Sequence, residues 1–358
     1  MKKSLIALAA LAAVSAASAQ STVTISGGVT LGVGTTEIGT ANSGLQIVRS
    51  TGNIQFAGTE DLGGGLIAGF QIQTTLGNAG VTNINNTTVT DANGAAATRS
   101  LLGDRASNLT LSGGFGTVLV GRGNTGVKNA MGVAGVAGLG VINDLSASSS
   151  AATTLIDDGV YVNAGGDANA RVIYGDTYAN QVAYASPTMN GFTLSVGVVP
   201  SQTVTTGVGN DGITKDNMSY SLAYANGPIA ANVNFLDAAN GTAPYQMTTV
   251  AASYDLGVIK IGVGQQSIRP DSGVSPGNGT MITANVPMGA GAFGFGYGRR
   301  TAAEQFSTSF GDNVKQSYFG YKHNLSKRTS IAAVYNQIDR TGTTTDMKET
   351  HILVGHSF

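Results

Sequence analysis

Three short motifs in the chain have the spacing of sites that perform chemistry in other proteins. Residues 121–126 and 207–212 match the glycine pattern of a dinucleotide-binding loop, which needs a helix directly after it to present backbone amides to a pyrophosphate. We find no helical pattern after either segment, and a chain with 52 glycines produces such matches by chance. Residues 273–277 match a hydrolase nucleophile elbow, but Pro270 and Pro276 place the serine at a loop tip, where the required strand–turn–helix cannot form. We predict no cofactor and no nucleophilic serine.

The residues that bind metals are equally sparse. The three histidines, His323, His351 and His356, fall in predicted late strands, and the chain has no cysteine. Because no two histidines have the spacing that would place them together on a helix, we expect no metal site. The lack of cysteine also excludes a disulfide framework and thiolate chemistry.

The charge balance argues against a nucleic-acid partner. The chain has 19 basic and 20 acidic residues, and charged residues make up 11% of it. Binding to a phosphate backbone needs a basic block, and the chain contains none. Low charge with many polar residues could indicate disorder, but the hydrophobic fraction of 42% and the regular alternation described below argue against it.

The start of the chain has the features of a secretory signal peptide. Lys2 and Lys3 are basic, residues 5–14 are apolar and residues 17–19 are small, which are the three parts of such a peptide. We expect cleavage after residue 19 and a mature domain of residues 20–358. An uncleaved membrane helix is the alternative, but the apolar run is shorter than the roughly 20 residues that span a bilayer.

The rest of the chain alternates between apolar and polar residues. Residues 192–198 alternate without a fault, as does the last segment, in which Phe358, Val354 and Ile352 share one face. Strict alternation predicts strands with one apolar and one polar face, and we place about 16 of them. No later apolar run is long enough for a membrane helix. Tight turns alternate with long loops, which is typical of an all-β, antiparallel transmembrane β-barrel. Periodicity alone leaves a soluble sandwich open.

Phe358 favours the barrel. A terminal aromatic residue on the apolar face has little use in a soluble core, where chain ends fray. It has a use if the last strand closes a barrel and faces lipid. His356 has the same parity, so we place it at the membrane interface, where polar groups cost little.

One connection, residues 124–179, is too long for an ordinary loop, and loops of this length are usually functional. It follows the fifth predicted strand and includes small, apolar residues 132–140. Such a composition suits a segment folded against a wall.

At this point the chain resembles the trimeric general-diffusion porins of Gram-negative bacteria, in particular the beta-proteobacterial type. The resemblance covers the mature chain, and its best segments are residues 58–66, 105–118, 120–122, 180–187 and 325–329 together with Phe358. It implies a homotrimer of 16-stranded barrels in the outer membrane, in contact with lipid and lipopolysaccharide. It also implies that the third long loop folds into the lumen and narrows it to an eyelet.

The resemblance also implies a ladder of arginines on the wall, facing acidic residues of the loop. Arg105 matches one ladder position. Asn53 occupies a second, with Arg49 four residues upstream, and the third has no arginine, since Ala183 and Ala185 flank Tyr184. Weak charge selectivity is therefore expected. The remaining candidates for the constriction are Arg122, Arg171, Asp144, Asp157 and Asp158.

Simpler roles remain open for these residues. Arg105 could be a solvated arginine at a strand end, Asp157 and Asp158 a solvated loop pair, and Arg49 and Asp144 ordinary surface residues. Under strict alternation Arg105 would share a face with Leu109 and Leu111, which requires a bulge or packing against the loop.

The function expected from these features is passive diffusion of small hydrophilic solutes and ions through a water-filled channel. The alternatives are an outer-membrane barrel enzyme, a phospholipase or protease with His323 and His351 converging on a serine or aspartate, and a plugged adhesin-type barrel. By the same resemblance, Phe358 is the signal read by the barrel-assembly machinery.

Overall fold

The computed structural model describes most of the chain. It describes residues 22–42, 44–76, 88–90, 96–98, 103, 105–137, 178–201, 215–240, 243–271, 277–301, 313–341 and 346–358. The predicted signal peptide, residues 1–19, lies outside these ranges and stays a prediction. No helix in the described ranges is long and apolar enough to cross a membrane.

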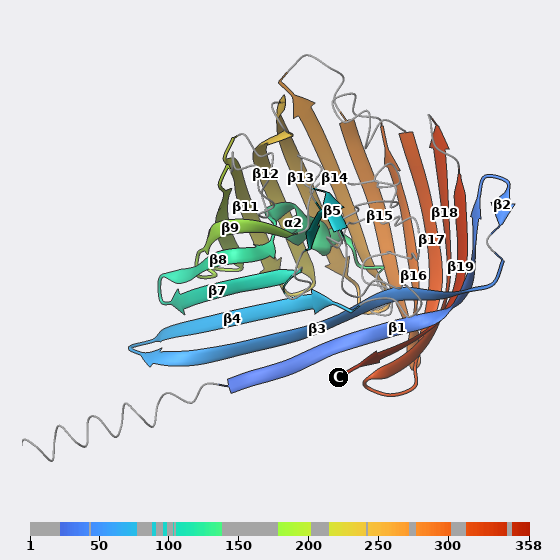
Figure 1. Cartoon of the computed structure of the whole chain (residues 1–358), viewed down its shortest axis with the longest axis horizontal. Coiled ribbons are helices and arrows are strands. Elements are labelled where there is room, and N and C mark those ends of the chain that lie inside the picture. The colour runs from blue at the N-terminus through green and yellow to red at the C-terminus, as the bar shows by residue number, and fades with distance from the viewer. Residues whose placement is uncertain are drawn as a thin grey trace, which may run out of the picture.

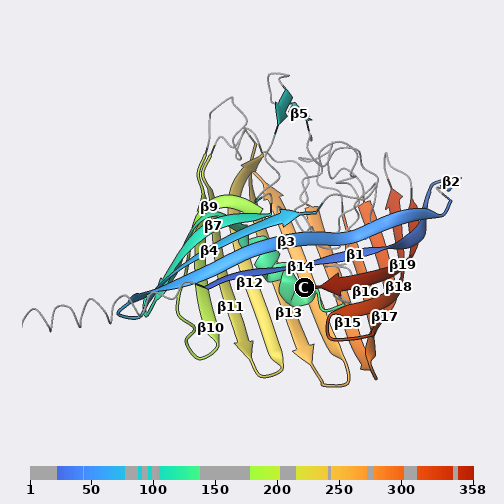
Figure 2. The same ribbon diagram turned by 60° about the horizontal axis from the view of Figure 1, so that its bottom comes forward.

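Sixteen antiparallel strands form a closed barrel (Figures 1 and 2). They are β1 (Thr22–Ile38), β3 (Gln46–Gly63), β4 (Leu66–Thr75), β7 (Ala106–Gly113), β8 (Gly116–Asn124), β9 (Tyr178–Ala185), β10 (Phe192–Val199), β11 (Asn217–Asn226), β12 (Ile229–Asn240), β13 (Ala243–Asp255), β14 (Lys260–Pro270), β15 (Gly277–Met288), β16 (Gly291–Arg300), β17 (Asn313–Asn324), β18 (Thr329–Thr341) and β19 (Met347–Ser357). Each strand pairs with its neighbours in sequence, and β1 also pairs with β19. The predicted fold class and strand number are confirmed.

Three further strands are short. β2 (Ala41–Asn42) pairs with the end of β1, and β5 (Thr88–Thr90) pairs with β6 (Ala96–Thr98) in a separate two-stranded sheet. One helix is described, α2 (Gly126–Ala134).

The tight turns lie where the sequence predicts them, at one end of the barrel. In two of them, Gly227 (φ 56°) and Gly289 (φ 57°) take the left-handed conformation, which glycine adopts without a steric cost. Closely spaced strand ends such as β11–β12 and β15–β16 follow from these turns.

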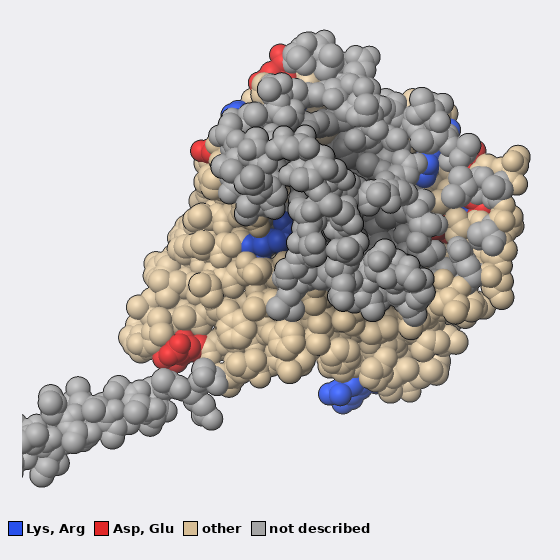
Figure 3. All heavy atoms as spheres, viewed as in Figure 1, with Lys and Arg blue, Asp and Glu red and all other residues tan. Residues whose placement is uncertain are grey.

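The outer face of the barrel is apolar, as the alternation predicts. In β19, Ile352 and Val354 are 54% and 49% exposed, whereas His351 and Leu353 are buried. Leu109 and Leu111 are exposed in the same way on β7. Among the residues coloured by type in Figure 3, charged side chains are few. A surface of this kind suits lipid, in which exposed backbone and charge are costly.

The barrel closes at the two ends of the described chain. Gly27 N donates to Phe358 O at 3.0 Å, and Phe358 N donates to Gly27 O at 3.0 Å. The register then runs from Gly28–Ser357 to Ile38–Met347. Phe358 therefore supplies the last hydrogen bonds of the seam, and its side chain is 45% exposed.

The inner face of β13 to β19 departs from the predicted polar lining. It carries buried apolar side chains, and we call this region the packed wall; its largest members are Met247, Ile268, Met281, Ile338, Met347 and Leu353. Polar residues of this wall bond to one another. Gln316 Nε2, for example, donates to Asn336 Oδ1 at 2.9 Å. Simple alternation predicts where these side chains point but not that they are covered.

Helix α2 covers part of the packed wall from inside the ring of strands (Figures 1 and 2). It contacts β11 to β15 and buries Val127, Ala130, Met131 and Ala134. Val136 N donates to Thr283 Oγ1 at 3.2 Å. The first part of the long connection between β8 and β9 thus lies in the lumen, while residues 138–177 lie outside the described residues.

Candidate functional site

A cavity of about 600 Å³ lies between the start of α2 and the opposite side of the lumen. That side is formed by the inner faces of β3, β4, β7, β8 and β9, which we call the open wall. The cavity is lined mainly by polar side chains, and its described lining contains no aspartate or glutamate. It is therefore a hydrophilic space, and the ionic groups among its described lining residues are those of Arg105 and Lys128, which are positive.

A row of amide side chains covers the open wall. We call these residues the amide ladder: Asn53, Gln55, Gln71, Gln73 and Asn108. Strand register places them together, because Gln55 lies opposite Gln73 and Gln71 lies opposite Asn108. Gln71 Nε2 donates to Gln55 Oε1 at 2.7 Å. Amides offer both donors and acceptors, so this surface can solvate either sign of ion.

Arg105 is held against this ladder. Its Nε donates to Gln73 Oε1 at 3.4 Å, and its backbone N donates to Gln73 O at 3.2 Å. The side chain is 6% exposed and lines the cavity. Arg105 precedes β7, which begins at Ala106, so strict alternation does not reach it. Its side chain therefore lies inside while Leu109 and Leu111 lie outside, without a bulge in β7.

Lys128 supplies the second positive side chain of the cavity. It lies in the first turn of α2, where the Thr125 hydroxyl accepts a hydrogen bond from Lys128 N at 3.2 Å. The first turn has no acidic residue. Because a helix N-terminus carries partial positive charge, the start of α2 adds to the charge of Lys128 rather than offsetting it.

A helix directly after residues 121–126 corrects the expectation that none follows this motif. The helix contains Gly126 and Gly132, and glycine lowers helix propensity, so the local pattern was weak. Packing against β12 to β15 stabilises it instead. The site is still not a dinucleotide fold, because β8 pairs with antiparallel neighbours and lacks the parallel crossover.

The other predicted site residues are dispersed. Asn53 lies on β3 and lines the cavity. Arg49 also lies on β3, opposite Leu31, and its side chain is outside the described set. Arg122 lies on β8, opposite Ser107 of β7, and has the same outward parity as Val120, which is exposed. The remaining candidates fall outside the described residues; they are Arg171, Asp144, Asp157 and Asp158.

Asn53 is a predicted site residue, but the other members of the amide ladder and Lys128 are not. The amide ladder could have been found from parity, since its members alternate with apolar residues on β3, β4 and β7. Lys128 has no such signal, because it falls in residues 124–179, which the sequence predicts as one long loop. Its position depends on where α2 packs.

The histidines do not form a site among the described residues. His323 lies opposite Gly291 and Ile331, near the tight-turn end, whereas His351 lies opposite Gly34 and Val334. His356 is exposed, as predicted, and is bonded to Thr329 through Nδ1 and Oγ1 at 2.9 Å. No group of three metal-ligating residues occurs in the part of the chain that the structure describes.

A closed barrel with an apolar exterior and a hydrophilic cavity in its lumen defines a membrane channel of the bacterial outer membrane. The chain belongs to the Gram-negative porin family, whose model matches residues 7–343. Outer membrane porin protein 32 of Delftia acidovorans is 31% identical over 353 residues, which is 92% of this chain and 88% of the relative. The protein is therefore an outer-membrane porin for passive diffusion of small hydrophilic solutes.

Solved structures show the same fold. An anion-selective porin from Comamonas acidovorans is similar with a TM-score of 0.68 and 22% identity, covering 95% of this chain and all of that one (100%). OmpF of Salmonella typhi, in complex with daunomycin, gives a TM-score of 0.62 at 12% identity over 94% of this chain and 97% of its own. Family membership indicates a channel rather than an enzyme.

Proposed function

We propose that the channel has a weak preference for anions and that this preference arises at the cavity between α2 and the open wall. The observation that carries the proposal is the composition of the described lining, which contains the side chains of Arg105 and Lys128 and the neutral amides of Asn53, Gln71, Gln73 and Asn108. Charges act strongly across a narrow space with low-dielectric walls. The preference is weak because the two further positions at which the family resemblance implies arginines hold Asn53 and the segment with Ala183 and Ala185.

The relatives support the sign of this preference. The similar porin from Comamonas acidovorans is described as anion-selective. We propose that residues 124–179 form the constriction, with Asp144, Asp157, Asp158 and Arg171 as candidates for its remaining charges. Acidic residues there would weaken the anion preference further.

Reversal potentials in planar bilayers under a KCl gradient test the proposal. We expect a modest chloride preference that falls in Arg105→Gln and in Lys128→Gln, because each variant removes one positive charge from the cavity. Lys215→Gln is the control, since Lys215 bonds Asp237 at 2.7 Å and does not line the cavity. A cation-selective channel, or identical potentials in all variants, would contradict the proposal.

We further propose a homotrimer embedded in outer-membrane lipid and lipopolysaccharide and inserted by the barrel-assembly machinery. A similar porin fold, OmpT of Vibrio cholerae, is described in a trimer form. The apolar barrel exterior fits a neighbouring subunit as well as lipid. Conductance that rises in groups of three equal steps, together with the mass in detergent, measures the oligomeric state; a monomeric mass would exclude the trimer.

A further inference from the structure

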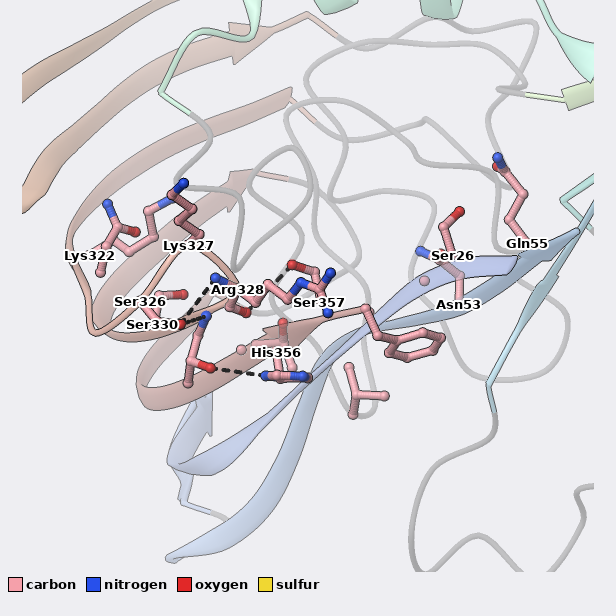
Figure 4. Close-up of a pocket in the computed structure, with 18 of the residues that line it drawn as sticks. Ser26, Asn53, Gln55, Lys322, Ser326, Lys327, Arg328, Ser330, His356 and Ser357 are labelled. Atoms are coloured by element: carbon pink, nitrogen blue, oxygen red, sulfur yellow. Dashed lines mark hydrogen bonds between the residues drawn. The ribbon is translucent and has the colours of Figure 1, made fainter. Parts of the chain in front are cut away.

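A second cavity, of about 480 Å³, lies inside the barrel at the end that carries the tight turns. It is formed by the inner faces of β1 and β3 on one side and by β17, β18 and the turn between them on the other (Figure 4). Three cationic residues line it: Lys322, Lys327 and Arg328. This cavity adjoins the one that contains Arg105 and Lys128, because Asn53 and Gln73 line both, but its cationic residues are different ones.

The three cations lie on one side of this cavity, across from Ser26, Asn53 and Gln55 (Figure 4). Among its described lining residues the only anionic group is the terminal carboxylate of Phe358, one of whose oxygens already accepts from Gly27 N. The structure gives Lys322, Lys327 and Arg328 no ion pair within the described chain. The lining therefore has a clear excess of positive charge.

The turn that carries the cations is well ordered by hydrogen bonds. Ser326 Oγ accepts from Arg328 N at 3.1 Å and from Thr329 N at 3.0 Å. Arg328 O accepts from Ser357 N at 2.9 Å, which ties the turn to β19. These bonds fix the backbone and leave the cationic ends of Lys327 and Arg328 available to a ligand.

We propose that this cluster is a binding site for phosphate-type oxyanions at the tight-turn mouth of the channel. Two ammonium groups and a guanidinium supply the charge and the donors that a tetrahedral oxyanion requires. Neutral hydroxyl and amide groups on the opposite wall complete its solvation. The site retains phosphate or a phosphomonoester in the lumen and raises its local concentration there.

Because tight turns of such barrels face the periplasm, the site is on the exit side for a solute entering the cell. Its role differs from that of the proposed anion preference. The cavity at Arg105 selects among passing ions, whereas this cluster holds a multivalent anion briefly. The inference rests on the channel itself and not on the sign of its selectivity.

Single-channel recording with inorganic phosphate added to one side tests the proposal. We expect phosphate to produce brief closures in a concentration-dependent manner, and at lower concentration from the tight-turn side. The triple variant Lys322→Gln/Lys327→Gln/Arg328→Gln should raise the half-blocking concentration by about tenfold, as expected for the loss of three partly exposed charge interactions.

A matched variant controls for net charge. Arg269→Gln/Lys315→Gln/Lys348→Gln removes the same number of positive charges from exposed residues at the long-loop ends of their strands, and phosphate block should remain as in the unaltered protein. Equal block from both sides, or equal loss of block in both triple variants, would overturn the site. Normal KCl steps in each variant separate failure of this inference from failure of the channel.

Discussion

The open wall and the packed wall are both made of alternating strands, but their inward-facing side chains differ in polarity. On the open wall the inner residues are amides that face a cavity. On the packed wall the inner residues include Met247, Ile268 and Met281, which are 2%, 0% and 4% exposed. One side of the barrel is a surface for water and solute, and the other is a core against which α2 packs.

This difference explains how a segment can be held inside a water-filled barrel. A polar inner face would not hold an inserted helix, because water can make the same contacts with that face as the helix can. The packed wall offers Met281 and glycines at which backbone can approach closely. A Cβ on Gly264 would come within 2.6 Å of Met131 Cε, so this glycine leaves the space that the Met131 side chain of α2 occupies.

The largest expected effect is on assembly of the barrel, and it arises where β1 pairs with β19 between the two walls. Deleting Phe358 removes two ladder hydrogen bonds and the terminal aromatic group, so we expect export to continue and outer-membrane assembly to fail. The measurement is the amount of protein in outer-membrane fractions that shows the heat-dependent gel mobility of a folded barrel. Phe358→Tyr keeps both features and should assemble. Normal insertion of the deletion variant would remove the assembly role of Phe358.

An arginine placed on each wall separates the two surfaces directly. Ile268→Arg buries an unpaired charge in the packed wall and should cost about 4 kcal/mol or more of folding free energy. Asn53→Arg places the same group in the cavity of the open wall, where water can reach it, and should leave the barrel folded. Urea unfolding in detergent measures both. Similar losses in the two variants would show that the walls do not differ in this way.

The Asn53→Arg variant also tests the ion selectivity of the channel. Asn53→Arg adds a charge to the amide ladder, so the chloride preference measured by reversal potential should increase. An unchanged reversal potential would mean that the narrowest part of the pore is not near Asn53.

The smallest effect concerns the contact between α2 and the packed wall. Met131 is fully buried, and Met131→Ala should cost about 2 kcal/mol or more through the cavity it leaves. We also expect noisier open-channel current, because α2 is held less firmly. Asn129→Ala, on the exposed side of the same helix, should change stability by less than about 0.5 kcal/mol. Equal effects would mean that α2 is not anchored by this face.

Much of the fold could be predicted because alternation and turn chemistry are local. The tight turns, the face of Phe358 and the outward position of His356 all follow from the sequence. Arg105 is harder, since its direction depends on whether β7 begins before or after it. Alternation fixes the face of a side chain only within a strand, and β7 begins one residue after Arg105.

Features that depend on tertiary packing could not be predicted in the same way. The sequence of α2 contains two glycines, and its helical state depends on the wall behind it. The apolar inner residues of the packed wall do leave a signal, since Met281 and Ile282 are adjacent apolar residues that must face opposite sides. Such breaks in alternation mark where a lumen is filled.

Because β1 pairs with β19, the barrel has no edge strand, and no strand is the first or last in the sheet. Thr22 and Phe358 both lie at the tight-turn end, so a short linker could join them, and the chain could be opened at another tight turn, such as the one at Gly227. Every strand would keep its two partners in such a circularly permuted barrel. The order of strands in the barrel is thus cyclic. The location of the two chain ends matters for export and assembly and not for the pairing of strands in the folded barrel.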